Sequence, residues 1–281
     1  MDGFFNINKP AGMSSAKVVA IVKRQCGKNV KVGHMGTLDP LAMGVLPIAV
    51  GRATRLFDLL LNKTKTYRAI FKFGYETDTL DTEGKVTKEG GSLPKLDELT
   101  KIARDFVGEM AQMPPIYSSK SVDGVRAYQL AREGKEVSLT PKRITINKLE
   151  LIKQIDESSF EFEIDCSAGT YVRAIGRDMA YKLSTFCTTQ SILRTRSGVF
   201  KLENAVELDS LKESDLLPMD CVLGDLNNLL LDGIALNKLL NGVKVNLLKP
   251  AGTYKLEGNG RLLGLLEIDD LGNARIVTRL G

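Results

Sequence analysis

In the first 30 residues, a short run of apolar residues is followed by apolar residues at the spacing of a helix. Residues 4–7 predict a first strand, and apolar positions at helical spacing follow over 16–22. Ser14 or Ser15 is suited to cap this helix, and Gly27 is suited to end it. The chain therefore begins with a predicted strand and a predicted helix.

The same two patterns predict further elements downstream. Residues 45–50 form the continuous apolar run of a buried strand, and 55–61 indicate a short helix. Alternation over 65–75 predicts a half-exposed strand, on which Tyr67 lies. A capped amphipathic helix is expected over about 96–106.

A polar, glycine-containing segment over 117–140 follows the proline pair at 114–115. Its composition is that of an arm outside the core, with a helical stretch near 125–132. We therefore expect this segment to project from the surrounding sheet.

Two strands and a helix are predicted after the arm. Residues 144–155 and 160–166 alternate as hairpin strands, and Gly169 and Thr170 then begin a helix that runs through Met179. This order of strands and helices predicts an α+β fold.

The composition changes after Met219. Residues 229–281 consist of short apolar stretches separated by glycines, a pattern typical of a small β-barrel or sandwich. We therefore expect a domain boundary near Gly224.

Composition narrows the class of protein. The 281 residues are 43% hydrophobic, enough for a large core, and the formal net charge is +5. The first ten residues lack the pattern of a signal segment and the longest apolar runs, such as 56–61, are far too short to span a bilayer, so we expect a cytoplasmic protein. The cysteines are scattered without a Cys-x-x-Cys pair, which argues against a zinc site or a disulfide framework: Cys26, Cys166, Cys187 and Cys221.

The segment 33–44 concentrates candidate chemistry. It contains His34, the only histidine, five positions before Asp39, which is followed by Pro40. Three glycines and a proline oppose helix and allow close approach of the backbone to a ligand. Taken alone, the segment is also compatible with an ordinary turn in which Asp39 caps backbone groups.

Asp39 lacks the partners of the common hydrolytic constellations. No second acid lies at short spacing, and one histidine cannot complete a triad around a distant serine or cysteine. A single carboxylate acting as nucleophile or base must stay ionised, and a neighbouring arginine would achieve this. Arg173, at a predicted strand-to-helix junction, is the best candidate, although the same residues also describe an ordinary helix start.

Nucleotide-binding motifs are absent from the sequence. There is no Gly-x-x-x-x-Gly-Lys-Ser/Thr, and the glycines around Asp39 do not match the dinucleotide fingerprint. Acidic residues concentrate between 76 and 98, whereas basic residues form several groups. Two interpretations of the basic groups remain open: they converge on one surface that contacts phosphates, or each is a separate solvent-exposed face. These groups are 17–31, 52–68, 120–135 and 173–196.

Assembled in order, the motifs resemble those of the TruB-type tRNA pseudouridine synthases, over nearly the whole chain. The resemblance rests on Asn8-Lys9-Pro10-x-Gly12-Met13-Ser14-Ser15, Gly33-His34-x-Gly36-Thr37-Leu38-Asp39-Pro40-Leu41-Ala42, Lys65-x-Tyr67, Met113-Pro114-Pro115-x-Tyr117-Ser118 and Cys166-Ser167-x-Gly169-Thr170-Tyr171-x-Arg173.

The resemblance implies a fold and an activity. It implies an α+β catalytic domain over 1–223, built on a mixed β-sheet with flanking helices, with an RNA-gripping arm over 117–140. A small β-rich PUA-like RNA-binding domain is expected over 224–281. The implied reaction converts uridine 55 in the T loop of tRNA to pseudouridine.

Residue roles follow from the resemblance. Asp39 resembles the catalytic aspartate, Tyr67 the tyrosine that stacks on the target base, and Arg173 the ion-pair partner of the aspartate. His34 resembles the residue that fills the T loop when the target is extruded, and Tyr171 a second aromatic of the pocket. An extruded base needs such stacking partners.

The remaining implications concern the pocket wall and the partners. Ile192 is expected in the pocket wall, and Leu193 stands where an arginine is common. No metal and no cofactor are implied, and the expected partner is the tRNA T stem-loop, bound by a monomer with no obligatory protein partner and no membrane. The residues expected to contact RNA are Lys9, Lys120, Arg126 and Arg132.

Three other functions remain open at this point. A tRNA-folding chaperone would use the same arm and basic groups with catalysis secondary, and a related enzyme would act on other RNA under a guide. A small-glycoside hydrolase usually needs two carboxylates and would not explain the basic groups. The first covalent step, at the ribose or by another route, is also open, as is whether Tyr67 only stacks or also moves a proton.

Overall fold

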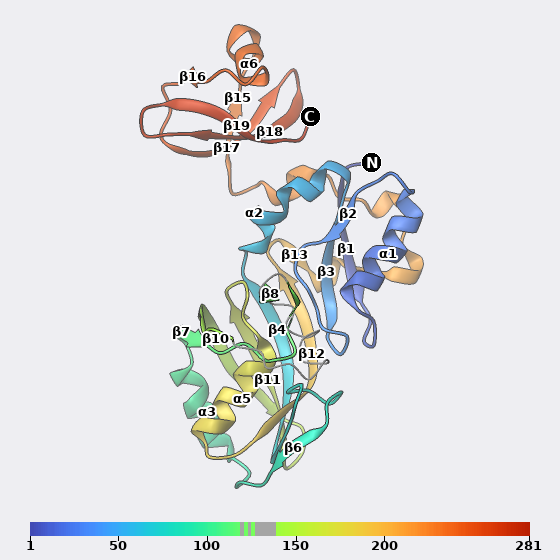
Figure 1. The fold of residues 1–281 in the computed structure, drawn as a ribbon, viewed down its shortest axis with the longest axis vertical. Coiled ribbons are helices and arrows are strands. Elements are labelled where there is room, and N and C mark those ends of the chain that lie inside the picture. The colour runs from blue at the N-terminus through green and yellow to red at the C-terminus, as the bar shows by residue number, and fades with distance from the viewer. Residues whose placement is uncertain (119–120, 123–124, 127–138) are drawn as a thin grey trace.

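A computed structural model describes residues 1–118, 121–122, 125–126 and 139–281. The main feature is a ten-stranded sheet in the order β14-β1-β3-β12-β4-β11-β10-β7, with β2 beside β3 and β13 beside β12 (Figure 1). Most neighbours are antiparallel, but β1 with β14 and β3 with β12 are parallel. The mixed sheet confirms the predicted α+β class.

The strands of this sheet come from the first three-quarters of the chain. They are β1 (Gly3–Lys9), β2 (Val32–His34), β3 (Met43–Val50), β4 (Lys65–Phe73), β7 (Gly108–Gln112), β10 (Lys142–Gln154), β11 (Ser159–Cys166), β12 (Cys187–Ser197), β13 (Phe200–Lys201) and β14 (Val206–Glu207). Two small hairpins add β5 (Tyr75–Thr77) with β6 (Val86–Glu89), and β8 (Ser121–Val122) with β9 (Val125–Arg126).

Helices cover one face of the large sheet. They are α1 (Ser15–Cys26), α3 (Leu96–Asp105) and α5 (Val172–Lys182), and their buried side chains share one core cluster with alternate residues of the strands. A 3₁₀ segment, η1 (Gly51–Leu56), continues into α2 (Phe57–Leu61), and η1 packs on the opposite face. Because β3 is buried on both faces, its sequence reads as an unbroken apolar run.

The C-terminal strands form a separate five-stranded sheet in the order β15-β17-β18-β19-β16 (Figure 1). The strands are β15 (Asn227–Leu230), β16 (Val245–Asn246), β17 (Gly252–Gly258), β18 (Arg261–Ile268) and β19 (Asn273–Arg279), and helix α6 (Gly233–Leu240) packs beside them. The expected β-rich region is therefore present, but α6 was not predicted, because the glycines around it dominate the local pattern.

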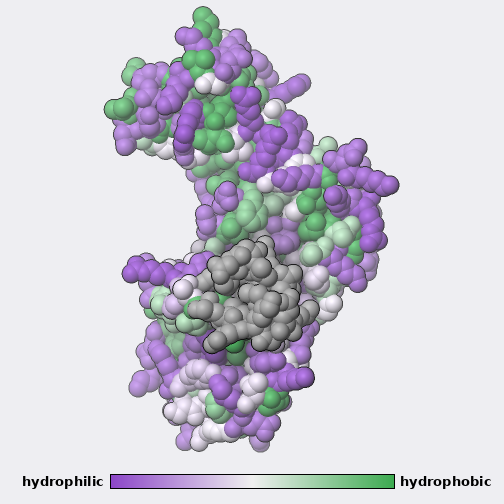
Figure 2. Space-filling model, in the orientation of Figure 1, coloured by the Kyte–Doolittle hydropathy of each residue, from purple (hydrophilic) through white to green (hydrophobic). Residues whose placement is uncertain are grey.

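The two sheets are joined by a small apolar contact. Leu265 and Leu280 of the C-terminal region are buried in one cluster with Ala53 and Leu56 of η1. The Arg55 guanidinium also donates a hydrogen bond to the carbonyl of Arg279 (2.6 Å). Elsewhere hydrophilic side chains cover most of the face shown in Figure 2.

Most predicted elements are confirmed, with shifts of a few residues at their ends. Ser14, not Ser15, caps α1, since its side chain accepts from the backbone of Lys17. The helix expected near 125–132 is wrong at its start, because Val125 and Arg126 form β9. The rest of that expected helix lies outside the described residues.

Short 3₁₀ turns follow β13, the first of them before β14 and the others between β14 and the C-terminal sheet. They are η2 (Leu202–Asn204), η3 (Leu208–Ser210), η4 (Glu213–Asp215) and η5 (Met219–Val222).

Candidate active site

Asp39 lies in the loop between β2 and β3, and the backbone of this loop is fixed on both sides. The N–H of Ala42 donates to the carbonyl of Asp39 (3.1 Å), and the N–H of Gly12 donates to the carbonyl of Pro40 (2.8 Å). Gly36 has a φ of 118°, which explains a glycine at this turn. The carboxylate is therefore presented from an ordered loop.

Two side chains from the N-terminal region hold the same loop. Ser15 Oγ donates to the carbonyl of Leu38 (2.8 Å) and accepts from its N–H (2.9 Å). Lys9 is fully buried, and its Nζ donates to the carbonyls of Pro10 (2.9 Å), Met13 (2.5 Å) and Pro40 (3.3 Å). Burial lowers the pKa of Lys9 from 10.5 to about 8, and the Asp39 carboxylate opposes this effect.

This position corrects the expectation that Lys9 contacts RNA. Its ammonium lies inside the protein and satisfies backbone carbonyls, so its role is structural. The sequence showed only a basic residue in a motif, and nothing in its spacing distinguished a buried from an exposed lysine.

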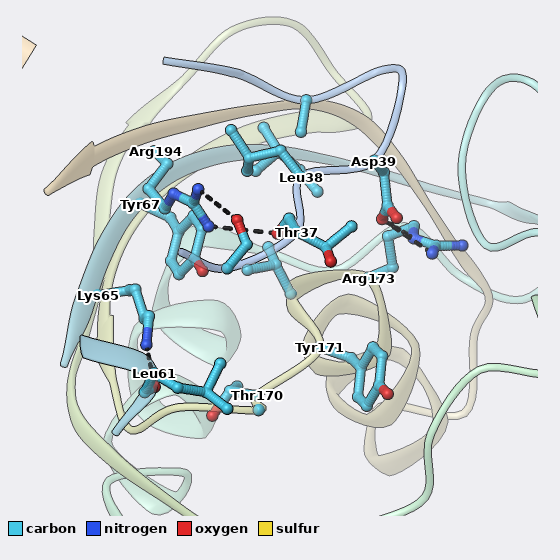
Figure 3. Close-up of a pocket in the computed structure, with 15 residues that line it drawn as sticks. Thr37, Leu38, Asp39, Leu61, Lys65, Tyr67, Thr170, Tyr171, Arg173 and Arg194 are labelled. Carbon is cyan, nitrogen blue, oxygen red and sulfur yellow. Dashed lines mark hydrogen bonds and ion pairs between the residues drawn. The ribbon is translucent and has the colours of Figure 1, made fainter. Parts of the chain in front are cut away.

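Arg194 supports the loop from the sheet. Its Nε donates to the carbonyl of Val45 (2.7 Å), its Nη2 to that of Gly36 (3.0 Å) and its Nη1 to that of Thr37 (3.3 Å) (Figure 3). The side chain is 1% exposed and stands opposite Tyr67 in the β12/β4 ladder. Within the basic group 173–196, Arg194 is therefore committed to the interior and is not available to a phosphate.

Arg173 and Asp39 form the ion pair that the sequence resemblance implied. Arg173 Nε and Nη2 lie 2.9 and 2.8 Å from Asp39 Oδ2 (Figure 3). The arginine side chain is 5% exposed, whereas that of Asp39 is 38% exposed. Both contacts use Oδ2, so Oδ1 is not engaged by the arginine.

The other guanidinium contacts of Arg173 fix its own position. Nη1 donates to the carbonyl of Thr79, and Nη2 donates to the carbonyl of Tyr117 (3.0 Å). Asp81 adds a second carboxylate, with Oδ2 3.5 Å from Nη1. Arg173 is thus held by groups from three separate segments of the chain.

Asp81 is a site residue that sequence reasoning missed. Its side chain is 6% exposed, and its Oδ1 accepts from Thr79 Oγ1 (2.6 Å) and the Glu83 N–H (3.1 Å). In the sequence it is one of several acidic residues between 76 and 98. The signal available in the sequence was the turn composition of 78–84, which has two aspartates and a glycine. In the structure Leu80 of this turn has a φ of 62°.

A cavity of about 210 Å³ opens beside Asp39 (Figure 3). Its walls are residues 36–39, residues 169–173 and side chains of β4 and β12. The lining combines charged groups at Asp39 and Arg173 with aromatic and aliphatic side chains. Such a mixture suits a flat, partly polar ligand.

Three of the predicted substrate-binding residues line this cavity: Tyr67, Tyr171 and Ile192. Burial raises the pKa of the Tyr67 phenol, and burial likewise raises the pKa of Tyr171. Both phenols are therefore neutral at physiological pH and offer uncharged ring faces.

Lys65 lines the cavity as well and was not singled out as a site residue. It is 4% exposed, and its Nζ donates to the carbonyls of Leu61 (2.7 Å) and Lys63 (2.6 Å). Burial, together with the charge of the nearby Arg194, lowers the pKa of Lys65 from 10.5 to about 8.

The remaining predicted residues either lie away from the cavity or fall outside the described residues. His34 is half-buried on β2, opposite Ile48, and does not line it. Arg126 belongs to β9, while Lys120 and Arg132 lie outside the described residues.

Comparison with known proteins finds relatives of one kind, the pseudouridine synthases. Residues 23–172 match the family model described as TruB family pseudouridylate synthase (N terminal domain). The tRNA pseudouridine synthase B of Caldanaerobacter subterraneus subsp. tengcongensis is 40% identical over 92% of this chain and 90% of its own length. That of Clostridium tetani is 39% identical over 87% and 86%, and that of Rickettsia akari 44% identical over 74% and 71%.

A solved structure shows the same fold at lower sequence identity. The crystal structure of a Cbf5-Nop10-Gar1 complex contains a chain that superposes with a TM-score of 0.72 at 23% identity, over 99% of this chain and 84% of that one. The family match covers more than half of the chain, and the relative from Caldanaerobacter covers nearly all of it. This chain therefore belongs to the TruB family of pseudouridylate synthases.

Proposed function

We propose that this protein isomerises uridine to pseudouridine in tRNA, with uridine 55 of the T loop as its target. Family membership supports the reaction, and the relatives named tRNA pseudouridine synthase B support tRNA as the substrate. The observation that carries the proposal is the Asp39 carboxylate, held by Arg173 in the wall of a cavity lined by tyrosines.

Asp39 is the group proposed to act on the substrate. The arginine favours the ionised carboxylate and fixes its direction, and the hydrogen-bonded loop holds its backbone. In the reaction the bond between C1′ and N1 of the uridine breaks, and a bond between C1′ and C5 forms. C5 loses a proton and N1 gains one, so the product is an isomer and no redox step occurs.

The cavity walls suit a base that has left the RNA stack. The neutral ring of Tyr67 stacks on the uracil, while Tyr171 and Ile192 limit its movement after the glycosidic bond breaks. A dry, closely lined pocket keeps the detached base from exchanging with water. Attack at the ribose would place Asp39 beside C1′ of the flipped nucleotide, whereas a covalent route through the base would place it beside the uracil ring.

The rest of the chain is proposed to bind tRNA. Lys120, Arg126 and Arg132 of the arm would contact phosphates, and His34 would fill the space vacated in the T loop. Residues 224–281 would form a PUA-like RNA-binding domain. We propose that the protein acts in the cytoplasm without an obligatory protein partner; within the described ranges, every helix is too short or too polar to cross a bilayer.

Mass-spectrometric mapping of an unmodified tRNA transcript tests the proposal. We expect pseudouridine at the T-loop uridine after incubation with wild-type protein and none with Asp39→Asn, which keeps the side-chain shape but removes the charge. Both proteins should bind the transcript. Tight binding without pseudouridine from the wild type would contradict the proposal and favour a tRNA-folding chaperone.

A further inference from the structure

We propose that Gln112 is a positioning residue for the TruB reaction, because its side-chain amide fixes the N-terminus of α5 and thereby the direction of Arg173. Gln112 is the last residue of β7 and is 1% exposed. Its Oε1 accepts from the N–H of Tyr171 (2.8 Å), and its Nε2 donates to the carbonyl of Tyr171 (3.1 Å). The inference rests on the function proposed above.

This pair of hydrogen bonds fixes the backbone of the residue at which α5 begins. Tyr171 is the N-cap residue, with an extended backbone, and its own side chain makes no capping hydrogen bond. Its carbonyl also accepts from the N–H groups of Ala174 and Ile175, but within the described part of the chain only Gln112 accepts from its N–H. A primary amide is the side-chain group that offers a donor and an acceptor side by side, as a neighbouring strand would.

The position of Tyr171 determines that of the catalytic ion pair. Arg173 is two residues further along and reaches Asp39 from the first turn of α5. A rotation of that turn would move Nε and Nη2 away from Asp39 Oδ2, and a displacement of about 1 Å near reacting groups costs about 100-fold in rate. The same rotation would move the Tyr171 ring in the cavity wall.

Neighbouring contacts show that the segment after β7 is docked on α5. Arg177 Nη2 donates to the carbonyl of Met113 (2.8 Å), and Arg173 Nη2 donates to the carbonyl of Tyr117 (3.0 Å). In both hydrogen bonds an arginine side chain of α5 donates to a backbone carbonyl of the segment after β7. Gln112 differs because its side chain binds the backbone of α5, at the residue where the helix begins.

The test substitutes Gln112→Met, which keeps the side-chain length and removes both polar groups. The single-turnover rate on a tRNA transcript is measured as a function of enzyme concentration, which separates the maximal rate from half-saturation. We expect the maximal rate to fall at least about tenfold, with half-saturation changed less than about threefold. A lost positioning contact lowers the rate in the bound state, whereas partial unfolding lowers only the active fraction.

A control and a second variant complete the design. Gln154→Met makes the same change at an exposed glutamine that donates to the carbonyl of Asp156 (3.0 Å), and it should leave both parameters unchanged. Gln112→Asn retains the amide on a shorter side chain, so it keeps the polar character of the site and should also slow the bound-state rate. If Gln112→Met does not fold, the bound-state rate of Gln112→Asn tests the inference.

Hydrogen exchange at the Tyr171 amide gives a readout that does not depend on activity. We expect faster exchange in Gln112→Met than in the wild type, because the N–H loses its acceptor. An unchanged maximal rate in both Gln112 variants, or equal protection of this amide in Gln112→Met and the wild type, would overturn the inference. An inactive wild type that binds tRNA would instead contradict the proposed function, and the exchange result would still judge the inference.

Discussion

Replacing Arg173 with lysine keeps the positive charge beside Asp39 but removes the planar fork. In the structure the guanidinium donates from Nε to Asp39 Oδ2, with Nη2 in ion-pair contact with the same oxygen, and donates once each to the carbonyls of Thr79 and Tyr117. A lysine ammonium is a single point on a flexible stem, so it cannot serve all of these acceptors from one position. Arg173→Lys therefore separates the contribution of geometry from that of charge.

The expected magnitude follows from the hydrogen bonds that a lysine cannot make. One charge-assisted hydrogen bond to Asp39 is worth about 1.5–3 kcal/mol, which corresponds to a fall in kcat/KM of about 10-fold to 150-fold if the bond matters in the transition state. Leaving the carbonyls of Thr79 and Tyr117 without this donor costs about 1–3 kcal/mol each in unfolding free energy. The melting temperature should therefore fall by several degrees.

Pseudouridine formation under single-turnover conditions, tRNA binding and thermal unfolding would be measured together. Arg196→Lys is the matched control, because Arg196 also forms a networked pair, with Asp165 and Thr66, but does not line the cavity. We expect the control to lose stability but to retain the bound-state rate. A rate for Arg173→Lys within about threefold of the wild type would refute the argument that the fork orients Asp39.

Two further predictions concern packing and pH. In Gly176→Ala the new Cβ would lie 2.8 Å from the Phe71 ring and 3.1 Å from Cys187 Sγ. We therefore expect the free energy of unfolding, measured with urea, to fall by about 1–3 kcal/mol, although alanine has the better helix propensity. Equal or greater stability of the variant would contradict this packing. Because the pKa of Lys9 is lowered to about 8, the folded state binds fewer protons than the unfolded state between about pH 8 and 10.5. The stability of the wild type relative to Lys9→Met should therefore rise with pH across that window, by at most about 1.4 kcal/mol per pH unit, and a flat difference in urea unfolding from pH 7.5 to 9.5 would contradict a buried lysine at this position.

The local features of the fold and site were accessible from the sequence. Helix α1 has a serine cap and a terminal glycine, and β4 alternates along its length, so short-range rules predicted both. The candidate acid was identified in the same way, because glycines and Pro40 around Asp39 mark a turn that presents a side chain. The pairing with Arg173 was implied by the family resemblance and by the need to hold a carboxylate ionised.

The parts that escaped prediction depend on long-range packing. Whether Lys9 and Arg194 point outward or inward is decided by loop carbonyls that come close only after folding. Asp81 reaches the site because the turn after β5 packs against α5, and the spacing of residues in the sequence does not predict this long-range contact. The helix α6 was hidden for a different reason, since its short apolar pattern stands among glycines.

The first strand of the chain is enclosed by one of the last strands of the large sheet. β1 pairs with β14, and the register partners Asn8 and Glu207 are 199 residues apart in sequence. During synthesis the segment around Asp39 leaves the ribosome long before Arg173 and Arg194 do, and such distant pairings form slowly. A nascent chain therefore has no complete cavity around Asp39 until β12 has emerged, so the candidate site is assembled only when translation of the large sheet is nearly complete.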